Sequence, residues 1–254
     1  MIIIISPAKK LDVNNESKTE KHTTPQFLDK SGELAEDLRR FSPKDLAVLM
    51  NVSNDIASLT FERYSRWRPP FNNDNAKQAL LAFKGDVYRS MDPESFSSED
   101  MDFAQNHLRI ISGLYGILRP LDLIQPYRLE MGIKFKTSAG KNLYEFWSDI
   151  ITTALNKELK KQKSGTIINL ASKEYFKAIL SARIKGEIVT PVFKEYRNDS
   201  YKVVGILAKR ARGMMCRFII QNRPEKVRDI KLFNEGGYSF DDNRSTETEW
   251  VFTR

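Results

Sequence analysis

Two carboxylates, Asp86 and Glu130, stand in sequence contexts that suit acid–base chemistry. Asp86 comes directly after an apolar run and a glycine, and Glu130 alternates with Arg128 in the segment 127–131. A carboxylate pair in one cleft can act as general acid and base, as glycosidic cleavage of a nucleoside would require. Structural roles are equally compatible: Asp86 suits a helix cap, and alternation in a strand would pair Arg128 with Glu130 on one face.

A helix expected over residues 208 to 222 has the clearest cationic pattern. Apolar residues recur at i, i+3, i+4 and i+7 and predict one packed face, formed by Ala211, Met214, Met215 and Phe218. The remaining arc then holds four cations with no acid among them: Lys209, Arg210, Arg212 and Arg217. Such an arc suits contacts to phosphates, although an ordinary surface helix has a similar pattern.

The single cysteine of the chain, Cys216, belongs to the same helix. It lies one turn from Arg212 and is expected on the cationic side, where a lowered thiol pKa would make it reactive toward peroxide. A bystander role is the favoured interpretation, because the chain holds no second thiol to resolve an oxidised one.

Four short apolar runs predict buried strands, at residues 2–5, 80–83, 108–111 and 167–170. Each run ends in small, polar or basic residues. In an open α/β sheet, ligands bind outside the carboxyl ends of the strands, where the loops converge. We therefore expect four residues from these exits to line one concave surface: Lys9, Lys84, Ser112 and Lys173.

The composition favours a basic, globular α/β protein. The chain has 254 residues and 41% hydrophobic content, enough to bury the core of a single domain over residues 1–254. Lys and Arg number 41 against 33 acidic residues, which gives a formal net charge of +8. A polyanion is the natural partner for this excess, and a soluble enzyme that is simply basic is the alternative.

The sequence also disfavours membrane and transition-metal functions. No stretch approaches the roughly 20 apolar residues of a membrane span, and the first apolar run lacks a basic flank, so we expect a cytoplasmic protein without a membrane partner. One cysteine excludes an intrachain disulfide, and the scattered His22 and His107 form no zinc or iron motif. We expect no cofactor and no metal, with a carboxylate-only metal site left open.

Cap and turn signals complete the expected mixed sheet with surrounding helices. Ser97 with Asp100 marks a helix start, because a serine cap and an acid three residues later satisfy free N–H groups of the first turn. Other signals predict an exposed loop over 10–26, a helix from Ser42-Pro43, a long helix over 143–161, a hairpin around Asn198-Asp199 and another within 236–254.

Seven segments in the same order make the chain similar to a known family. These are residues 6–9, 83–88, 112–116, 118–122, 127–131, 169–176 and 208–213, for example Phe83-Lys84-Gly85-Asp86-Val87-Tyr88 and Ala208-Lys209-Arg210-Ala211-Arg212-Gly213. Together they span essentially the whole chain. In this order they resemble the YaaA family of bacterial peroxide-stress-response proteins.

The resemblance implies a single-domain mixed α/β fold of unusual topology, with a positively charged cleft and a helix-hairpin-helix-like element. It also implies a protein that binds DNA and limits oxidative damage under hydrogen peroxide, in a family associated with lowering free intracellular iron. The turn at Gly113 and Gly116 is one candidate for the hairpin, and residues 30–52 are a second.

Two functions of different classes therefore remain. The first is a monomeric protein that binds DNA, double-stranded or branched, through nine cations: Lys9, Lys84, Arg119, Arg128, Lys173, Lys209, Arg210, Arg212 and Arg217. The alternative is an enzyme acting on a nucleobase, nucleoside or damaged DNA with Asp86 and Glu130 as acid and base. Iron sequestration is disfavoured, because soft and imidazole ligands are nearly absent.

Overall fold

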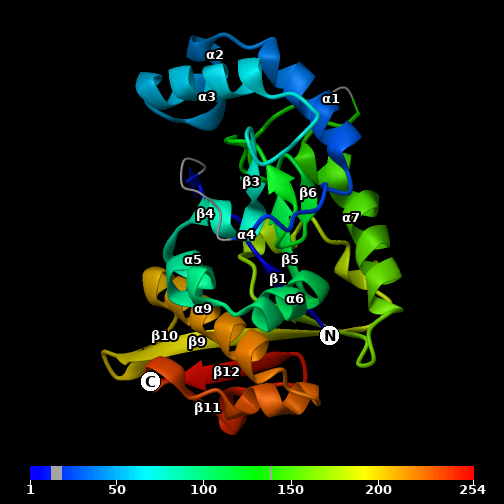
Figure 1. Cartoon of the computed structure of the whole chain (residues 1–254). Coiled ribbons are helices and arrows are strands. Elements are labelled where there is room, and N and C mark those ends of the chain that lie inside the picture. Colours follow the sequence, from blue (N-terminus) through cyan, green and yellow to red (C-terminus); the bar gives the residue numbers. More distant parts are fainter. Residues whose placement is uncertain (13–18, 138) are drawn as a thin grey trace.

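A mostly parallel sheet forms the centre of the computed structural model, which describes residues 1–12, 19–137 and 139–254 (Figure 1). Five of its strands are mutually parallel and lie side by side in the order β5 (Leu108–Ser112), β1 (Ile2–Ile5), β8 (Thr166–Asn169), β9 (Glu187–Arg197) and β12 (Glu249–Thr253). Numbered along the chain, this order is 2-1-3-4-5, that of a doubly wound α/β sheet. The strand order, but not the direction of the strands, reverses between β1 and β8.

Three antiparallel strands extend this sheet. They are β6 (Gly116–Leu118) beside β5, β11 (Ser239–Phe240) beside β12, and β10 (Ser200–Lys202) beside β9. Two short pairs lie apart from it: β2 (Lys10–Leu11) with β4 (Phe83–Lys84), and β3 (Lys77–Gln78) with β7 (Leu123–Ile124).

Three of the predicted strands, at 2–5, 108–111 and 167–170, are confirmed as the core of the sheet. Every residue of β1, β5 and β8 is buried, as expected for parallel strands covered on both faces. The register places Ile3 of β1 between Leu108 of β5 and Ile168 of β8. The apolar runs therefore end together at one edge of the sheet.

Helices surround the sheet, and three of them form a separate group at the top of Figure 1. That group comprises α1 (Leu28–Arg39), α2 (Pro43–Met50) and α3 (Asn54–Arg66). The others are α4 (Ala79–Ala82), α5 (Asp86–Met91), α6 (Ser98–His107), α7 (Leu143–Leu159), α8 (Lys173–Phe176) and α9 (Gly205–Asn222). Short 3-10 turns lie at Pro93–Ser95, Ser181–Arg183, Val227–Leu232, Glu235–Gly237 and Asp242–Arg244.

The predicted helix starts at Ser42 and Ser97 are confirmed. The Ser97 hydroxyl accepts from the Asp100 N–H, and the Asp100 carboxylate accepts from the Ser97 N–H. Ser42 makes the same reciprocal pair with Asp45. Each box satisfies two N–H groups that the first helical turn leaves free.

The predicted strand at 80–83 is wrong. Residues Ala79–Ala82 form one helical turn, α4, and only Phe83 and Lys84 are extended, as β4. A four-residue apolar run fits a buried helical turn as well as a buried strand, and here all four helical residues are buried.

The hairpin predicted at Asn198-Asp199 is confirmed, and both residues have left-handed backbone angles (φ 49° and 58°). Its second strand is shorter than expected, because α9 already begins at Gly205. The hairpin within 236–254 is confirmed as β11 and β12. Segment 127–131, in contrast, is not a strand: residues 127–130 have no regular secondary structure and Met131 lies in a turn.

The turn at Gly113 and Gly116 is a hairpin between two strands, because β5 and β6 pair antiparallel across it. It therefore is not a hairpin between helices. Gly116 has φ +69°, and a side chain there would also collide with Trp147. The second candidate region, 30–52, contains α1 and α2 joined by residues 40–42.

Candidate functional site

The carboxyl ends of β1 and β8 meet at the point where the strand order reverses, the place where open α/β sheets bind ligands. Ser6 follows β1 and Ser172 follows the end of β8. The Ser172 N–H donates to Ser6 Oγ at 2.8 Å, and the two hydroxyl oxygens are 3.3 Å apart. The Tyr88 hydroxyl of α5 donates to the Ser6 carbonyl at 3.0 Å, so α5 is tied to the same edge.

A cluster of charged side chains lies at this edge. Glu130 pairs with Lys9 at 2.7 Å and with Arg128 at 3.1 Å, and its side chain is 26% exposed. The predicted pairing of Arg128 with Glu130 is thus confirmed. Arg128 Nε is buried and has no hydrogen-bond partner among the residues that the structure describes. A buried donor without an acceptor is unfavourable, so an acceptor that reached this atom would stabilise the site.

Glu174 joins the cluster from α8. One of its oxygens accepts from the Gly132 N–H at 3.0 Å, and a side chain at position 132 would crowd that carboxylate. The neighbouring Tyr175 is buried; burial raises the pKa of its hydroxyl, and the nearby Tyr127, Glu174 and Glu130 raise it further. Tyr175 is therefore neutral at physiological pH.

A pocket of about 650 Å³ opens between this cluster and the C-terminal end of α2. We call it the α2 pocket. Apolar and charged residues both line it: Val48, Leu49, Met50, Asn51 and Ile133 with Lys9, Arg128, Glu130, Gly132, Lys134 and Glu174. A small adjoining cavity shares Lys9, Arg128 and Glu130 and is otherwise lined mainly by Tyr127, Leu129 and Tyr175.

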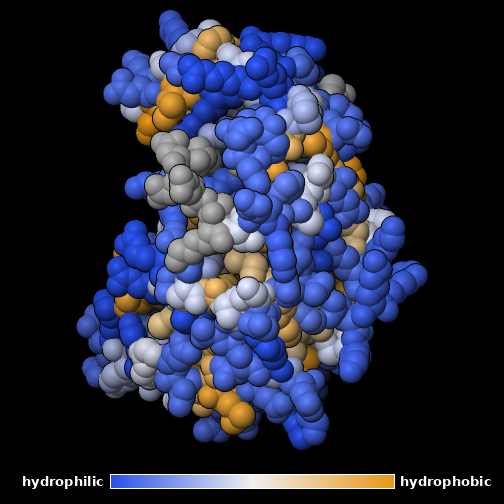
Figure 2. All heavy atoms as spheres, viewed as in Figure 1, coloured by the Kyte–Doolittle hydropathy of each residue, from blue (hydrophilic) through white to orange (hydrophobic). Residues whose placement is uncertain are grey.

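A larger groove of about 1110 Å³ runs between α3 and α5. Figure 2 shows the surface hollowed below the α1–α3 group, with hydrophobic atoms gathered on that group beside the hollow. The described lining is balanced in charge: the cations are Lys10, Arg63, Arg66, Lys84 and Arg89, and the acids are Asp12, Glu62, Asp74, Asp92 and Glu94. Arg63 makes no ion pair with a described residue, and burial lowers the pKa of its guanidinium.

Helix α9 presents its cations beside α5, and a glycine sets the separation of the two helices. A Cβ at Gly213 would lie 2.1 Å from the Val87 carbonyl oxygen, so only glycine allows this approach. Lys209 and Arg210 are exposed, and Arg210 lies 4.0 Å from Asp86 of α5.

Arg212 differs from these neighbours because it is half-buried. No described carboxylate pairs with it, and burial lowers the pKa of its guanidinium. A cation removed from water without a counter-charge is unfavourable, and an anion beside it would offset that cost.

The sequence matches the family model described as peroxide stress protein YaaA over residues 1–244. It is also 48% identical over 256 residues to a UPF0246 protein from Paraburkholderia phytofirmans (strain DSM 17436 / LMG 22146 / PsJN), covering 100% of this chain and 98% of that protein. The chain belongs to the YaaA family.

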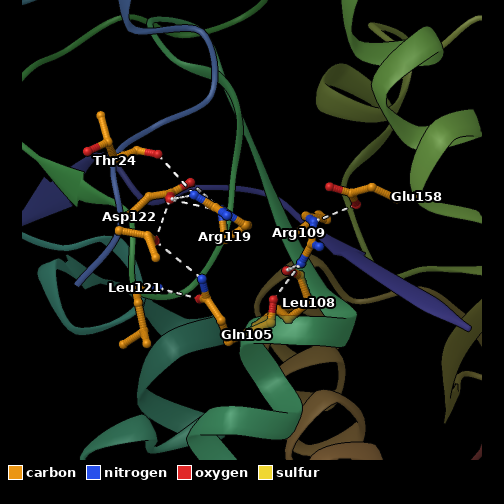
Figure 3. Close-up of polar contacts among 9 residues, drawn as sticks. Thr24, Gln105, Leu108, Arg109, Arg119, Leu121, Asp122 and Glu158 are labelled. Carbon is orange, nitrogen blue, oxygen red and sulfur yellow. Dashed lines mark hydrogen bonds and ion pairs between the residues drawn. The ribbon is translucent and has the colours of Figure 1, made fainter. Parts of the chain in front are cut away.

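In this YaaA-family protein several of the expected phosphate-binding cations hold the fold together. Arg119 donates to Asp122 Oδ1 and to the Thr24 carbonyl (Figure 3). Arg217 donates to the carbonyls of Met91 and Asp92 and to Ser95 Oγ. Lys84 pairs with Glu94. Each of these cations already has an anionic or carbonyl partner within the chain.

The four residues expected from the strand exits do not line one pocket as predicted. Lys9 lines the α2 pocket, Lys84 lines the groove between α3 and α5, and Lys173 is exposed on α8. Ser112 is buried and bonds to the Tyr127 hydroxyl at 2.7 Å. The run at 80–83 contributes no strand to the central sheet, because most of it forms α4.

Asp86 and Glu130 occupy different positions in the YaaA-family fold. Glu130 lines the α2 pocket, whereas Asp86 lies in the first turn of α5 and faces Arg210. The cap interpretation of Asp86 is wrong, because Gly85 is the N-cap residue and the Asp86 carboxylate lies one position inside the helix.

The expected position of Cys216 on the cationic side is wrong, whereas its burial agrees with the favoured bystander interpretation. Its side chain is fully buried beside Met215, and burial raises the pKa of the thiol. Helix α9 packs against α5 as well as the sheet, so its buried arc is wider than the single stripe the spacing predicted.

Sequence reasoning missed three residues of the YaaA site: Arg63, Val48 and Glu174. Glu174 lies shortly after the end of β8, and a charged residue in that position could have been predicted as a site residue. Arg63 and Val48 lie on helices whose relation to the sheet is set by tertiary packing, and no local pattern marks them. Within the described residues no helix is long and apolar enough to span a membrane, and no three His, Cys, Asp or Glu side chains are grouped to hold a metal.

Proposed function

We propose that this YaaA-family protein binds DNA during peroxide stress and limits its oxidative damage. The observation that carries the proposal is Arg212, a half-buried cation with no described carboxylate beside it, on a helix that also exposes Lys209 and Arg210. A phosphate would supply the missing negative charge through a charge-assisted hydrogen bond. The net charge of +8 favours the same class of partner.

The proposed contact surface includes cations at the carboxyl edge of the sheet. Lys173 is exposed without a described ion pair, and Lys9 is exposed although it touches Glu130. Arg63, which makes no ion pair with a described residue, adds a cation in the groove between α3 and α5. These side chains would contact phosphates. Such contacts position DNA without reading its sequence, so we propose that a monomer binds both double-stranded and branched DNA.

The helix-hairpin-helix-like element of the proposal is α1 with α2. The short connection of residues 40–42 joins the two helices, and Ser42 caps the second one. The C-terminal end of α2 lines the α2 pocket, so DNA held by this element would lie beside the cluster at Glu130.

The proposal extends to lowered free iron, the other property that the family resemblance implies. Iron and peroxide together produce the oxidant that attacks DNA, so lower iron and a protected duplex would reduce the same lesions. Both effects would be seen as fewer DNA breaks in cells exposed to peroxide.

A salt series of duplex binding tests the DNA proposal. Fluorescence anisotropy of the wild type should show log Kd rising linearly with log salt. Charge reversal of Lys209, Arg210 and Arg212 should weaken binding. It should also flatten that slope by on the order of one unit for each phosphate that the variant no longer neutralises.

The matched control reverses three exposed lysines at and just after the C-terminal end of α7: Lys157, Lys160 and Lys161. It makes the same change in net charge, so it corrects for the general loss of attraction. Equal affinity and slope in the folded α9 and α7 variants would contradict the proposal that α9 contacts DNA.

A further inference from the structure

We propose that the α2 pocket receives one unpaired, unstacked nucleotide of the bound DNA. The inference rests on the proposed DNA binding and specifies which part of the DNA this site would recognise. Its volume of about 650 Å³ lies in the range of pockets that enclose a small organic ligand. The pocket also lies beside the crevice where β1 and β8 end, which is the expected ligand position in this sheet order.

The two kinds of lining residue match the two kinds of surface on a nucleobase. Val48 is 78% exposed although it is apolar, and Leu49, Met50 and Ile133 are further apolar lining residues. A base has a flat face that stacks on apolar or aromatic side chains, in a way that tolerates any base. Covering Val48 with such a face would remove it from water.

The charged lining residues offer a donor and an acceptor for the polar edge of a base. Arg128 Nε is buried and lacks an acceptor among the described residues. Glu174 uses one oxygen for the Gly132 N–H, and its other oxygen has no hydrogen-bond partner in the described part of the chain. Each base carries both donors and acceptors on its free edge once it is unpaired, so it can satisfy both groups.

Exposed cations of the lining suit the phosphate of the same nucleotide. Lys134 lines the pocket and is exposed, and Lys9 lines it with 65% of its side chain exposed. A paired base would first have to leave its stack, which costs a few kcal/mol. DNA with an already unpaired nucleotide avoids this cost and is the expected preferred ligand.

Anisotropy with three oligonucleotides of common sequence tests the proposal. One is a matched duplex, one carries a single bulged nucleotide, and one carries an abasic residue at the bulge. The bulged duplex should bind about tenfold more tightly than the matched duplex, as expected for stacking of one base. The abasic bulge should lose that gain.

Val48→Asn should reduce the preference for the bulge, that is, the ratio of the affinities for bulged and matched duplex, by about threefold. Ile56→Asn is the control, because Ile56 is also an exposed apolar residue of the α1–α3 group but does not line the pocket. Val48 is so exposed that the variant should fold, and its unfolding transition verifies this.

The outcomes separate this inference from the proposed function. If the matched duplex binds with a salt-dependent affinity but the bulged duplex binds no more tightly, the pocket assignment is overturned and DNA binding stays in place. The same conclusion follows if the abasic bulge binds as tightly as the bulged duplex. A free mononucleotide that binds as tightly as the bulged DNA shows that the ligand is not part of DNA and also overturns it. Absence of binding to every DNA overturns both proposals.

Discussion

The contact between α5 and α9 gives a prediction in which two opposing effects can be compared. Alanine at position 213 would gain up to about 1 kcal/mol of helix propensity relative to glycine. Its Cβ would, however, lie 2.1 Å from the Val87 carbonyl oxygen and 3.0 Å from Ser90 Cβ. The first of these atoms is backbone, so α5 and α9 must move apart.

Overpacking of this kind typically costs about 1–3 kcal/mol, and a clash with backbone belongs at the upper end of that range. The clash therefore exceeds the propensity gain, and Gly213→Ala should destabilise the protein by about 2 kcal/mol. In a chain of this size that corresponds to a Tm lowered by about 4–8 °C. Differential scanning fluorimetry and urea unfolding measure both quantities.

Gly205→Ala is the matched control in the same helix. No described atom lies within 4 Å of the Cβ that it would add, so it should be neutral or slightly stabilising. If Gly213→Ala proves as stable as Gly205→Ala, the reasoning that a close helix contact requires glycine here is refuted.

Three further predictions concern single side chains. Cys216 should resist thiol alkylation at pH 8 until the protein unfolds, because burial raises its pKa; rapid labelling of the native protein would contradict this. Burial raises the pKa of Glu195, but hydrogen bonds from Tyr238 and Arg254 outweigh it and leave the pKa lowered. The ionised carboxylate therefore stabilises the fold fully above about pH 4.5, and this stabilisation is lost as pH falls through the lowered pKa. The destabilisation by Glu195→Gln in urea should accordingly be smaller at pH 3 than at pH 7. Asp86→Asn should change stability by less than about 1 kcal/mol and leave DNA affinity equal or higher, and weaker binding would argue against the account of α9.

The sequence was sufficient for the elements that are buried on both faces or capped by side chains. The runs at 2–5, 108–111 and 167–170 could be predicted because parallel strands inside an α/β sheet are continuously apolar. The start at Ser97 could be predicted because its partner lies three residues away. In both cases the deciding interactions are local or depend only on burial.

Features fixed by distant contacts could not be predicted in the same way. The run at 80–83 is ambiguous between strand and helix, and its surroundings select the helix. Arg119 and Arg217 look like free cations in the sequence, but the fold brings the Thr24 carbonyl to Arg119 and the carbonyls at the end of α5 to Arg217. The order of the strands, and hence the position of the crevice, also depends on pairings more than 100 residues apart.

The salt dependence of DNA binding by Arg212→Gln tests the central claim most directly. Glutamine removes the half-buried charge but keeps a polar side chain. No described carboxylate pairs with Arg212, so the variant should lose only the proposed ion pair with a phosphate of DNA. The account predicts a folded variant whose slope of log Kd against log salt is about one unit smaller than that of the wild type. An unchanged slope and affinity would contradict the claim that α9 contacts the phosphates of DNA.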